Sequence, residues 1–184
     1  MIKELYTNNW FNYEEFYSEI AKKGYKNLVE VGVWKGHSIS FLAKELIKNN
    51  NLNFNLYAVD LFDETYQKGG VRTEYEFENI VEIYNQVLTE AGVRKYITDI
   101  KGFSWDMAES FNDNSLDFIF IDADHTYESV VKDLNAWYPK LKRGGIISGH
   151  DYMNNDFGVK QAVNELMPGF KLTKDKIVWF KEKK

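Results

Sequence analysis

Apolar residues along the chain follow two different periods, and segments of the two kinds alternate. Short apolar runs that end at glycine or an acidic residue predict strands buried on both faces of a sheet. These runs occupy residues 27–32, 54–60, 95–102, 115–122 and 144–151. Apolar residues that recur every three or four positions predict helices. These stretches cover residues 13–23, 36–47, 77–92, 130–141 and 157–167.

Strands that alternate with helices predict a doubly wound α/β fold, in which helices cover both faces of a mostly parallel sheet. The end of the chain departs from this alternation, because short apolar runs at 170–173 and 177–180 flank a polar Lys-Asp-Lys turn. That pattern is typical of a hairpin and predicts an antiparallel edge. We expect a single domain over residues 1–184, with an N-terminal helical segment at 1–25.

Residues 61–79 show neither period and contain Gly69 and Gly70. The segment joins the end of a strand to a helix, a position from which loops often close over a substrate. We therefore expect it to be a lid.

Composition narrows the classes of protein that fit. The chain has 184 residues and a formal net charge of −5, and its one obvious basic run is the terminal Lys-Glu-Lys-Lys. Duplex-binding proteins usually carry clustered basic surfaces, so we expect no nucleic-acid partner. The absence of cysteine excludes disulfides, thiolate zinc sites and cysteine nucleophiles. Without an apolar signal core or a run of about 20 apolar residues, we expect a soluble, cytoplasmic protein with no membrane partner.

The turn after the first predicted strand reads Glu-Val-Gly-Val-Trp-Lys-Gly, from Glu30 to Gly36. A dinucleotide fingerprint needs G-x-G-x-x-G, so that the backbone can approach a pyrophosphate. Trp34 stands where the second glycine would be, and its indole blocks that approach. The Walker pattern is absent too. The sequence therefore predicts a pocket for a ligand without a diphosphate, and disfavours a nicotinamide-dependent oxidoreductase.

This stretch resembles motif I of the class I S-adenosylmethionine-dependent methyltransferases, and the order of elements matches that family over nearly the whole chain. The resemblance implies a Rossmann-like, seven-stranded sheet and S-adenosylmethionine as cofactor. The loop between Gly32 and Gly36 would pass under the methionine half of the cofactor. Glu30 would help to hold the cofactor's amino group.

Further cofactor contacts follow from the same resemblance. Asp60, at the end of the second strand, would accept hydrogen bonds from the ribose hydroxyls, and an acceptor-only carboxylate suits a vicinal diol. Ser104 and Trp105 fall where the family encloses adenine. The alternatives are that Asp60 caps a loop and that Trp105 is a core residue.

Acids and imidazoles follow the fourth and fifth predicted strands. Asp122, Asp124 and His125 come after the fourth strand, and His150 and Asp151 come after the fifth. Since adjacent parallel strands end at one edge of a sheet, we expect these side chains to converge. A divalent cation would offset their charge, because carboxylates suit magnesium or calcium and imidazole admits ions such as manganese.

The two stretches resemble a subgroup of the family that methylates hydroxyls of sugars and natural products. Its pattern is D-G-D-x-Y-E after the fourth strand and D-D-Y or H-D-Y after the fifth. The resemblance implies that Asp122 and Asp151 hold the metal, with His150 in place of an acid, and that Asp122 also lies beside the cofactor. Asp124 would be the general base, and His125 and His150 are alternative bases, because imidazole accepts a proton near neutral pH.

Several alternatives stay open. Asp124 could serve only to cap the next helix. The acceptor could be a catechol-like phenol, or the protein could bind its cofactor without turnover. The N/D-P-P-Y/F signature of nitrogen methyltransferases is absent, because the chain reads Ile-Asp-Ala-Asp after the fourth strand. We expect a small-molecule or sugar substrate, and a homo-oligomer is one open outcome.

Overall fold

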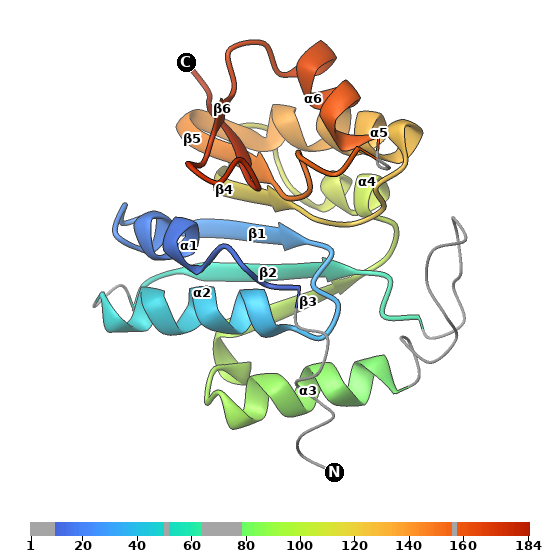
Figure 1. Cartoon of the computed structure of the whole chain (residues 1–184). Helices are drawn as coiled ribbons and strands as arrows, with labels where there is room; N and C mark the ends of the chain where they lie inside the picture. Colours follow the sequence, from blue (N-terminus) through green and yellow to red (C-terminus); the bar gives the residue numbers. More distant parts are fainter. Residues whose placement is uncertain (1–9, 50–51, 64–78, 156–157) are drawn as a thin grey trace.

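Seven strands form one mixed sheet in the computed structural model, which describes residues 10–49, 52–63, 79–155 and 158–184. The strand order is β3-β2-β1-β4-β5-β7-β6 (Figure 1). The strands are β1 Asn27–Val31, β2 Asn55–Asp60, β3 Ile97–Lys101, β4 Leu116–Ile121, β5 Leu141–Gly149, β6 Lys171–Leu172 and β7 Trp179–Glu182. Strands β1 to β5 pair in parallel, whereas β7 pairs antiparallel with both β5 and β6.

Helices cover both faces of this sheet (Figure 1). One face carries α1 Glu14–Ala21, α2 His37–Lys48 and α3 Ile80–Glu90. The other face carries α4 Ser104–Met107, α5 Tyr127–Trp137 and α6 Val159–Leu166. Short 3-10 turns lie at Arg94–Tyr96, Ala108–Ser110 and Tyr138–Lys140.

Alternation along the buried strands divides the core into two layers. On β1, Leu28 packs with the helices α1 to α3, whereas Val29 and Val31 pack with the helices of the opposite face. Glu30 shares the face of Leu28, because every second side chain of a strand points the same way. Its carboxyl group is therefore directed toward α1 and α2, where it meets side chains of both helices.

The predicted doubly wound fold, its seven strands and its closing hairpin are confirmed. The sequence pattern missed α4, because four residues are too few to display a helical period. Strand β5 begins at Leu141, earlier than the predicted residue 144. Most of the predicted lid, residues 64–78, falls outside the described residues. The expectation of a single domain over residues 1–184 stays a prediction.

Within the described ranges, no helix combines the length and the apolar character that crossing a membrane requires.

Candidate active site

The register of the three central strands brings the acids and imidazoles to one edge of the sheet. Val31 of β1 pairs with Ile121 of β4, and Ile121 pairs with Gly149 of β5. The pairing continues one residue further, because the amide of Asp122 donates to the Val31 carbonyl at 2.8 Å and the amide of His150 donates to the Ile121 carbonyl at 3.3 Å. The residues that follow each strand therefore start side by side.

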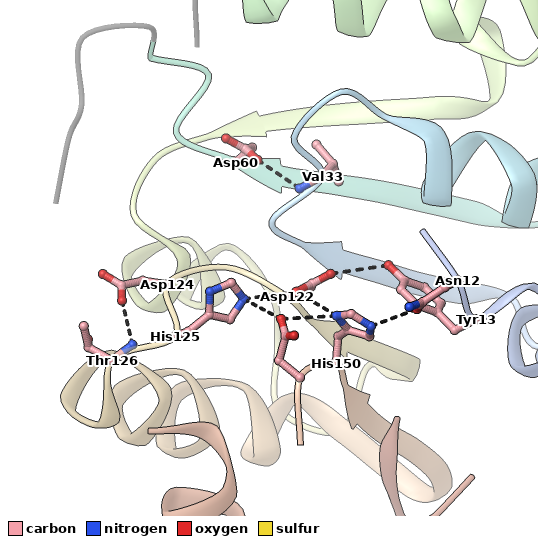
Figure 2. Close-up of polar contacts among 10 residues, drawn as sticks. Asn12, Tyr13, Val33, Asp60, Asp122, Asp124, His125, Thr126 and His150 are labelled. Atoms are coloured by element: carbon pink, nitrogen blue, oxygen red, sulfur yellow. Dashed lines mark hydrogen bonds and ion pairs between the residues drawn. The ribbon is translucent and has the colours of Figure 1, made fainter. Parts of the chain in front are cut away.

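Four side chains at this edge form what we call the acid–imidazole cluster: Asp122, His125, His150 and Asp151, of which Figure 2 labels the first three. His125 Nε2 lies 3.3 Å from Asp122 Oδ1 and 3.0 Å from Asp151 Oδ2. His150 Nδ1 lies 3.2 Å from the same Asp151 oxygen and 3.9 Å from the same Asp122 oxygen. Two imidazole nitrogens thus converge on the same two carboxylate oxygens.

The electrostatics of the cluster favour charged imidazoles when no cation is bound. Burial alone would lower the pKa of His125, but the carboxylates of Asp122 and Asp151 outweigh it and raise that pKa to about 9. The same balance raises the pKa of His150. Burial alone would raise the pKa of Asp151, yet hydrogen bonds from both imidazoles hold that pKa below the usual range. The negative charge of the two acids is therefore offset within the cluster itself.

The donor set of the cluster fits a divalent cation. Ligand atoms of Asp122, His125 and Asp151 all lie within 4.8 Å of one another. Carboxylate oxygens with an imidazole nitrogen suit ions such as manganese. The predicted ligand set included His150 in place of His125. The structure brings both imidazoles to the same carboxylates, and the tighter triad contains His125.

Asp124 lies beside the cluster and makes a different contact. Its Oδ1 accepts a hydrogen bond of 2.8 Å from the amide of Thr126, the residue that precedes α5 (Figure 2). Such a bond satisfies one of the amides that a helix leaves unpaired at its start. This geometry favours the alternative in which Asp124 caps α5. Its role as general base stays a prediction.

The turn after β1 requires glycines because neighbouring atoms leave no room for a side chain at two of its positions. Gly32 has φ of 86°, and a Cβ atom there would lie 2.2 Å from the Asp122 carbonyl oxygen. Gly36 has φ of 79°, and a Cβ atom there would lie 2.7 Å from the Tyr84 ring. Between them Trp34 has φ of 44°, which is rare for a bulky residue. The end of β4 therefore requires glycine at position 32, whatever ligand the turn receives.

Asp60 holds this turn in place. Its Oδ2 accepts hydrogen bonds from the amides of Val33 and Trp34 at 2.9 and 3.0 Å (Figure 2 draws the first). Its Oδ1 accepts a hydrogen bond of 3.1 Å from the amide of Phe62. An acid at the end of β2 was predicted as the ribose acceptor. In the structure the same carboxylate clamps the loop that would surround the ribose.

Glu30 supports the turn from within the core. The side chain is fully buried, and its carboxyl oxygens accept hydrogen bonds from Tyr17 Oη at 2.8 Å and from the Ser38 hydroxyl. Burial raises the pKa of Glu30 to about 8, although both hydrogen bonds act in the opposite direction. Glu30 therefore links β1 to helices α1 and α2.

Ser104 and Trp105 begin α4, just after β3. The Ser104 hydroxyl donates to Oδ1 of Asp133 in α5. The Trp105 ring stacks on Phe103, with centroids 5.3 Å apart, and carries Lys132 Nζ at 4.5 Å from its centre. Both predicted adenine contacts thus lie at the carboxyl end of β3, where the ligand was expected.

Asn12 and Tyr13 reach the acid–imidazole cluster and were missed by the sequence analysis. Asn12 Oδ1 lies 3.0 Å from His150 Nε2, and the Tyr13 hydroxyl donates to Asp122 Oδ2 at 3.4 Å. The contact with His150 joins positions 138 apart in sequence. No local pattern signals such a contact, because it depends on how α1 packs against the finished sheet.

Comparison with curated proteins finds a similar but uncharacterized protein of Acanthamoeba polyphaga mimivirus, with 25% identity over 141 residues. The match covers 76% of this chain and 58% of the viral protein. The chain therefore spans less than two thirds of the length of this curated relative.

Solved structures share the fold. A proposed caffeoyl-CoA O-methyltransferase from Staphylococcus aureus has a TM-score of 0.69 at 17% identity, covering 100% of this chain and 89% of that chain. An O-methyltransferase from Bacillus cereus in complex with SAH scores 0.65 at 14% identity, covering 99% and 86%. A TDP-rhamnose 3'-O-methyltransferase of calicheamicin biosynthesis scores 0.59 at 12% identity, covering 98% and 79%. At these identities, the likeness establishes the fold.

A family model described as a methyltransferase domain matches residues 29–152, which is more than half of the 184 residues. The matched segment starts within β1, contains the turn between Gly32 and Gly36, and ends just after Asp151. It therefore includes the whole acid–imidazole cluster. The chain belongs to this family of methyltransferase domains.

Proposed function

We propose that the protein is an S-adenosylmethionine-dependent O-methyltransferase that acts on a hydroxyl of a sugar or another small molecule, assisted by a divalent cation. The observation that carries the proposal is that Asp122, His125 and Asp151 converge at the sheet edge where the motif I turn also lies. Membership of the methyltransferase-domain family supports methyl transfer. The SAH bound by the Bacillus cereus structure supports the cofactor.

The cofactor would lie across the carboxyl ends of β1, β2 and β3. An ionised carboxylate offers about four lone-pair sites, so Asp60 can accept from a ribose hydroxyl in addition to its three backbone donors. Ser104, held by Asp133, starts the helix beside the expected adenine position. Glu30 supports this site indirectly, because its carboxyl group holds Ser38 near the start of α2. Asp122 lies where the cofactor and the cation would adjoin.

The chemistry requires an acceptor oxygen that is aligned with the methyl group and relieved of its proton. Methyl transfer from a sulfonium is an in-line displacement, so alignment contributes much of the rate. A bound divalent cation supplies polarisation of the acceptor oxygen. His125 or His150 could take the proton only in its neutral form and with a nitrogen that does not ligate the cation. Asp124 would serve as the base only if its carboxylate left the Thr126 amide.

The acceptor is proposed at the level of a hydroxyl on a small molecule. The subgroup pattern around Asp122 and Asp151 favours a sugar or natural-product hydroxyl. A catechol-like phenol is the runner-up, because the proteins of this fold include both a TDP-rhamnose 3'-O-methyltransferase and a proposed caffeoyl-CoA O-methyltransferase.

Chelation separates the proposed metal assistance from the proposed binding of S-adenosylmethionine. In EDTA, methyl transfer to a panel of nucleotide-sugar and catechol acceptors should be lost, because the cation serves the acceptor oxygen. Calorimetry should still show binding of S-adenosylmethionine, and added Mn²⁺ should restore turnover. Asp124→Asn should slow turnover by about 10²–10⁴ if Asp124 is the base, and should leave it unchanged if Asp124 only caps α5.

Each failure has a distinct meaning. Full turnover in EDTA would overturn metal assistance and leave a general base that acts without a cation as the mechanism. Absence of S-adenosylmethionine binding would overturn the cofactor assignment. Binding without turnover on the acceptor panel and without hydrolysis of the cofactor would favour a non-catalytic, cofactor-binding protein.

A further inference from the structure

The segment that leads into α1 contributes two side chains to the acid–imidazole cluster. Asn12 Oδ1 lies 3.0 Å from His150 Nε2, and the Tyr13 hydroxyl donates to Asp122 Oδ2 at 3.4 Å. Figure 2 shows both residues on the side of His150 that faces away from His125. The N-terminal segment and the ends of β4 and β5 therefore meet at one place.

The contact with Asn12 determines which nitrogen of His150 faces the carboxylates. An amide oxygen accepts only, so it requires a hydrogen on Nε2. The other nitrogen, Nδ1, then lies 3.2 Å from Asp151 Oδ2 and 3.9 Å from Asp122 Oδ1. When a cation displaces the proton from Nδ1, an imidazole that keeps its hydrogen on Nε2 presents the Nδ1 lone pair to the ion. Metal-ligating histidines almost always donate their second N–H to such a partner.

The packing around Tyr13 holds Asn12 in position. Tyr13 is 6% exposed, its ring stacks on Phe120 with centroids 4.7 Å apart, and its centroid lies 5.0 Å from that of His150. Further along α1, Tyr17 is anchored to Glu30. Asn12 itself is exposed, so its side chain can be changed without opening the core.

We propose that Asn12 is a positioning residue for His150: its amide oxygen holds the Nε2 hydrogen and so directs Nδ1 toward Asp122 and Asp151 as a ligand for the divalent cation. The inference rests on the proposed metal-assisted function. It adds a residue of the N-terminal segment to the site and gives His150 a specific coordinating atom.

Binding of Mn²⁺ to the metal-stripped full chain, measured by calorimetry without cofactor or acceptor, tests the proposal. Asn12→Ala should weaken Mn²⁺ binding about 10–100-fold, as loss of such a partner does elsewhere. Asn12→Asp keeps an acceptor oxygen and should retain most of the affinity. Asn49→Ala is the matched control, because the Asn49 side chain donates to the Glu45 carbonyl at the end of α2. It should bind Mn²⁺ like the unmodified chain.

A double variant separates positioning from a general structural effect. If Asn12 acts through His150, the variant with both Asn12→Ala and His150→Gln should bind Mn²⁺ no more weakly than His150→Gln alone. Additive losses would overturn the proposal, and so would an Asn12→Ala variant that binds like the unmodified chain. Failure of the unmodified chain to bind Mn²⁺ would instead overturn the metal-assisted function on which the inference rests. Far-UV circular dichroism confirms that each variant is folded.

Discussion

Asp60 accepts three backbone hydrogen bonds from the two loops that would surround a ribose. An acid at the end of a second strand could be predicted to face the ligand, since the end of the strand is visible in the sequence. The clamp could not be predicted, because it depends on the path of the turn through Gly32, Trp34 and Gly36, each with positive φ. The Asp60 carboxylate therefore both fixes the path of the turn and lies where the ribose is expected to bind.

Replacing Asp60 should affect both properties. Asp60→Ala leaves the amides of Val33 and Trp34 without their acceptor, so we expect the free energy of unfolding to fall by about 1–3 kcal/mol. Affinity for S-adenosylmethionine should fall tenfold or more, since a charge-assisted bond contributes about 1.5–3 kcal/mol. Asp60→Asn retains one acceptor oxygen, so its stability and its affinity for S-adenosylmethionine should lie between those of Asp60→Ala and those of the unmodified chain. Urea unfolding and calorimetry measure the two effects, and an Asp60→Ala variant unchanged in both would rule out the clamp.

The elements themselves were largely readable from periodicity, because buried strands and amphipathic helices differ in period over enough residues. Helix α4 was missed, since Ser104–Met107 is a single turn. The N-terminal helix was predicted, but its contacts were not, because Tyr17 bonds to Glu30 within β1 and Asn12, just before the helix, contacts His150 after β5. Helix α1 thus supports the site through contacts that only the folded sheet defines.

The link between α1 and β1 should be measurable. Tyr17→Phe removes one of the two donors to the buried Glu30, and we expect the free energy of unfolding to fall by about 1–3 kcal/mol. Tyr25→Phe is a matched control, because the Tyr25 hydroxyl donates to the Gly144 carbonyl at the exposed surface. Urea unfolding of both variants at neutral pH provides the comparison. If both variants lost the same free energy of unfolding, the buried bond from Tyr17 to Glu30 would stabilise the fold no more than a surface hydrogen bond does.

Across the whole molecule, buried acids lie on both faces of the sheet. Glu30 faces α1 and α2, and Asp133 lies in α5 on the opposite side; both are fully buried. Burial raises the pKa of Glu30 to about 8 and that of Asp133 to about 7. Each folded acid therefore keeps a proton at pH values where the unfolded chain has lost it, starting from 4.5 for Glu30 and 3.8 for Asp133.

Because the folded state binds more protons over these ranges, stability should fall as the pH rises. We expect the free energy of unfolding to decrease between about pH 5 and about pH 8, by up to about 1.4 kcal/mol per pH unit for each acid. Glu30→Gln keeps an amide oxygen for one of its donors and cannot titrate, so it should flatten the decrease up to about pH 8, where Glu30 titrates. Asp133→Asn should flatten it only up to about pH 7. Urea unfolding across a pH series measures both slopes. If Glu30→Gln had the slope of the unmodified chain, Glu30 would be ionised in the folded protein, as an acid that meets the cofactor's amino group directly should be.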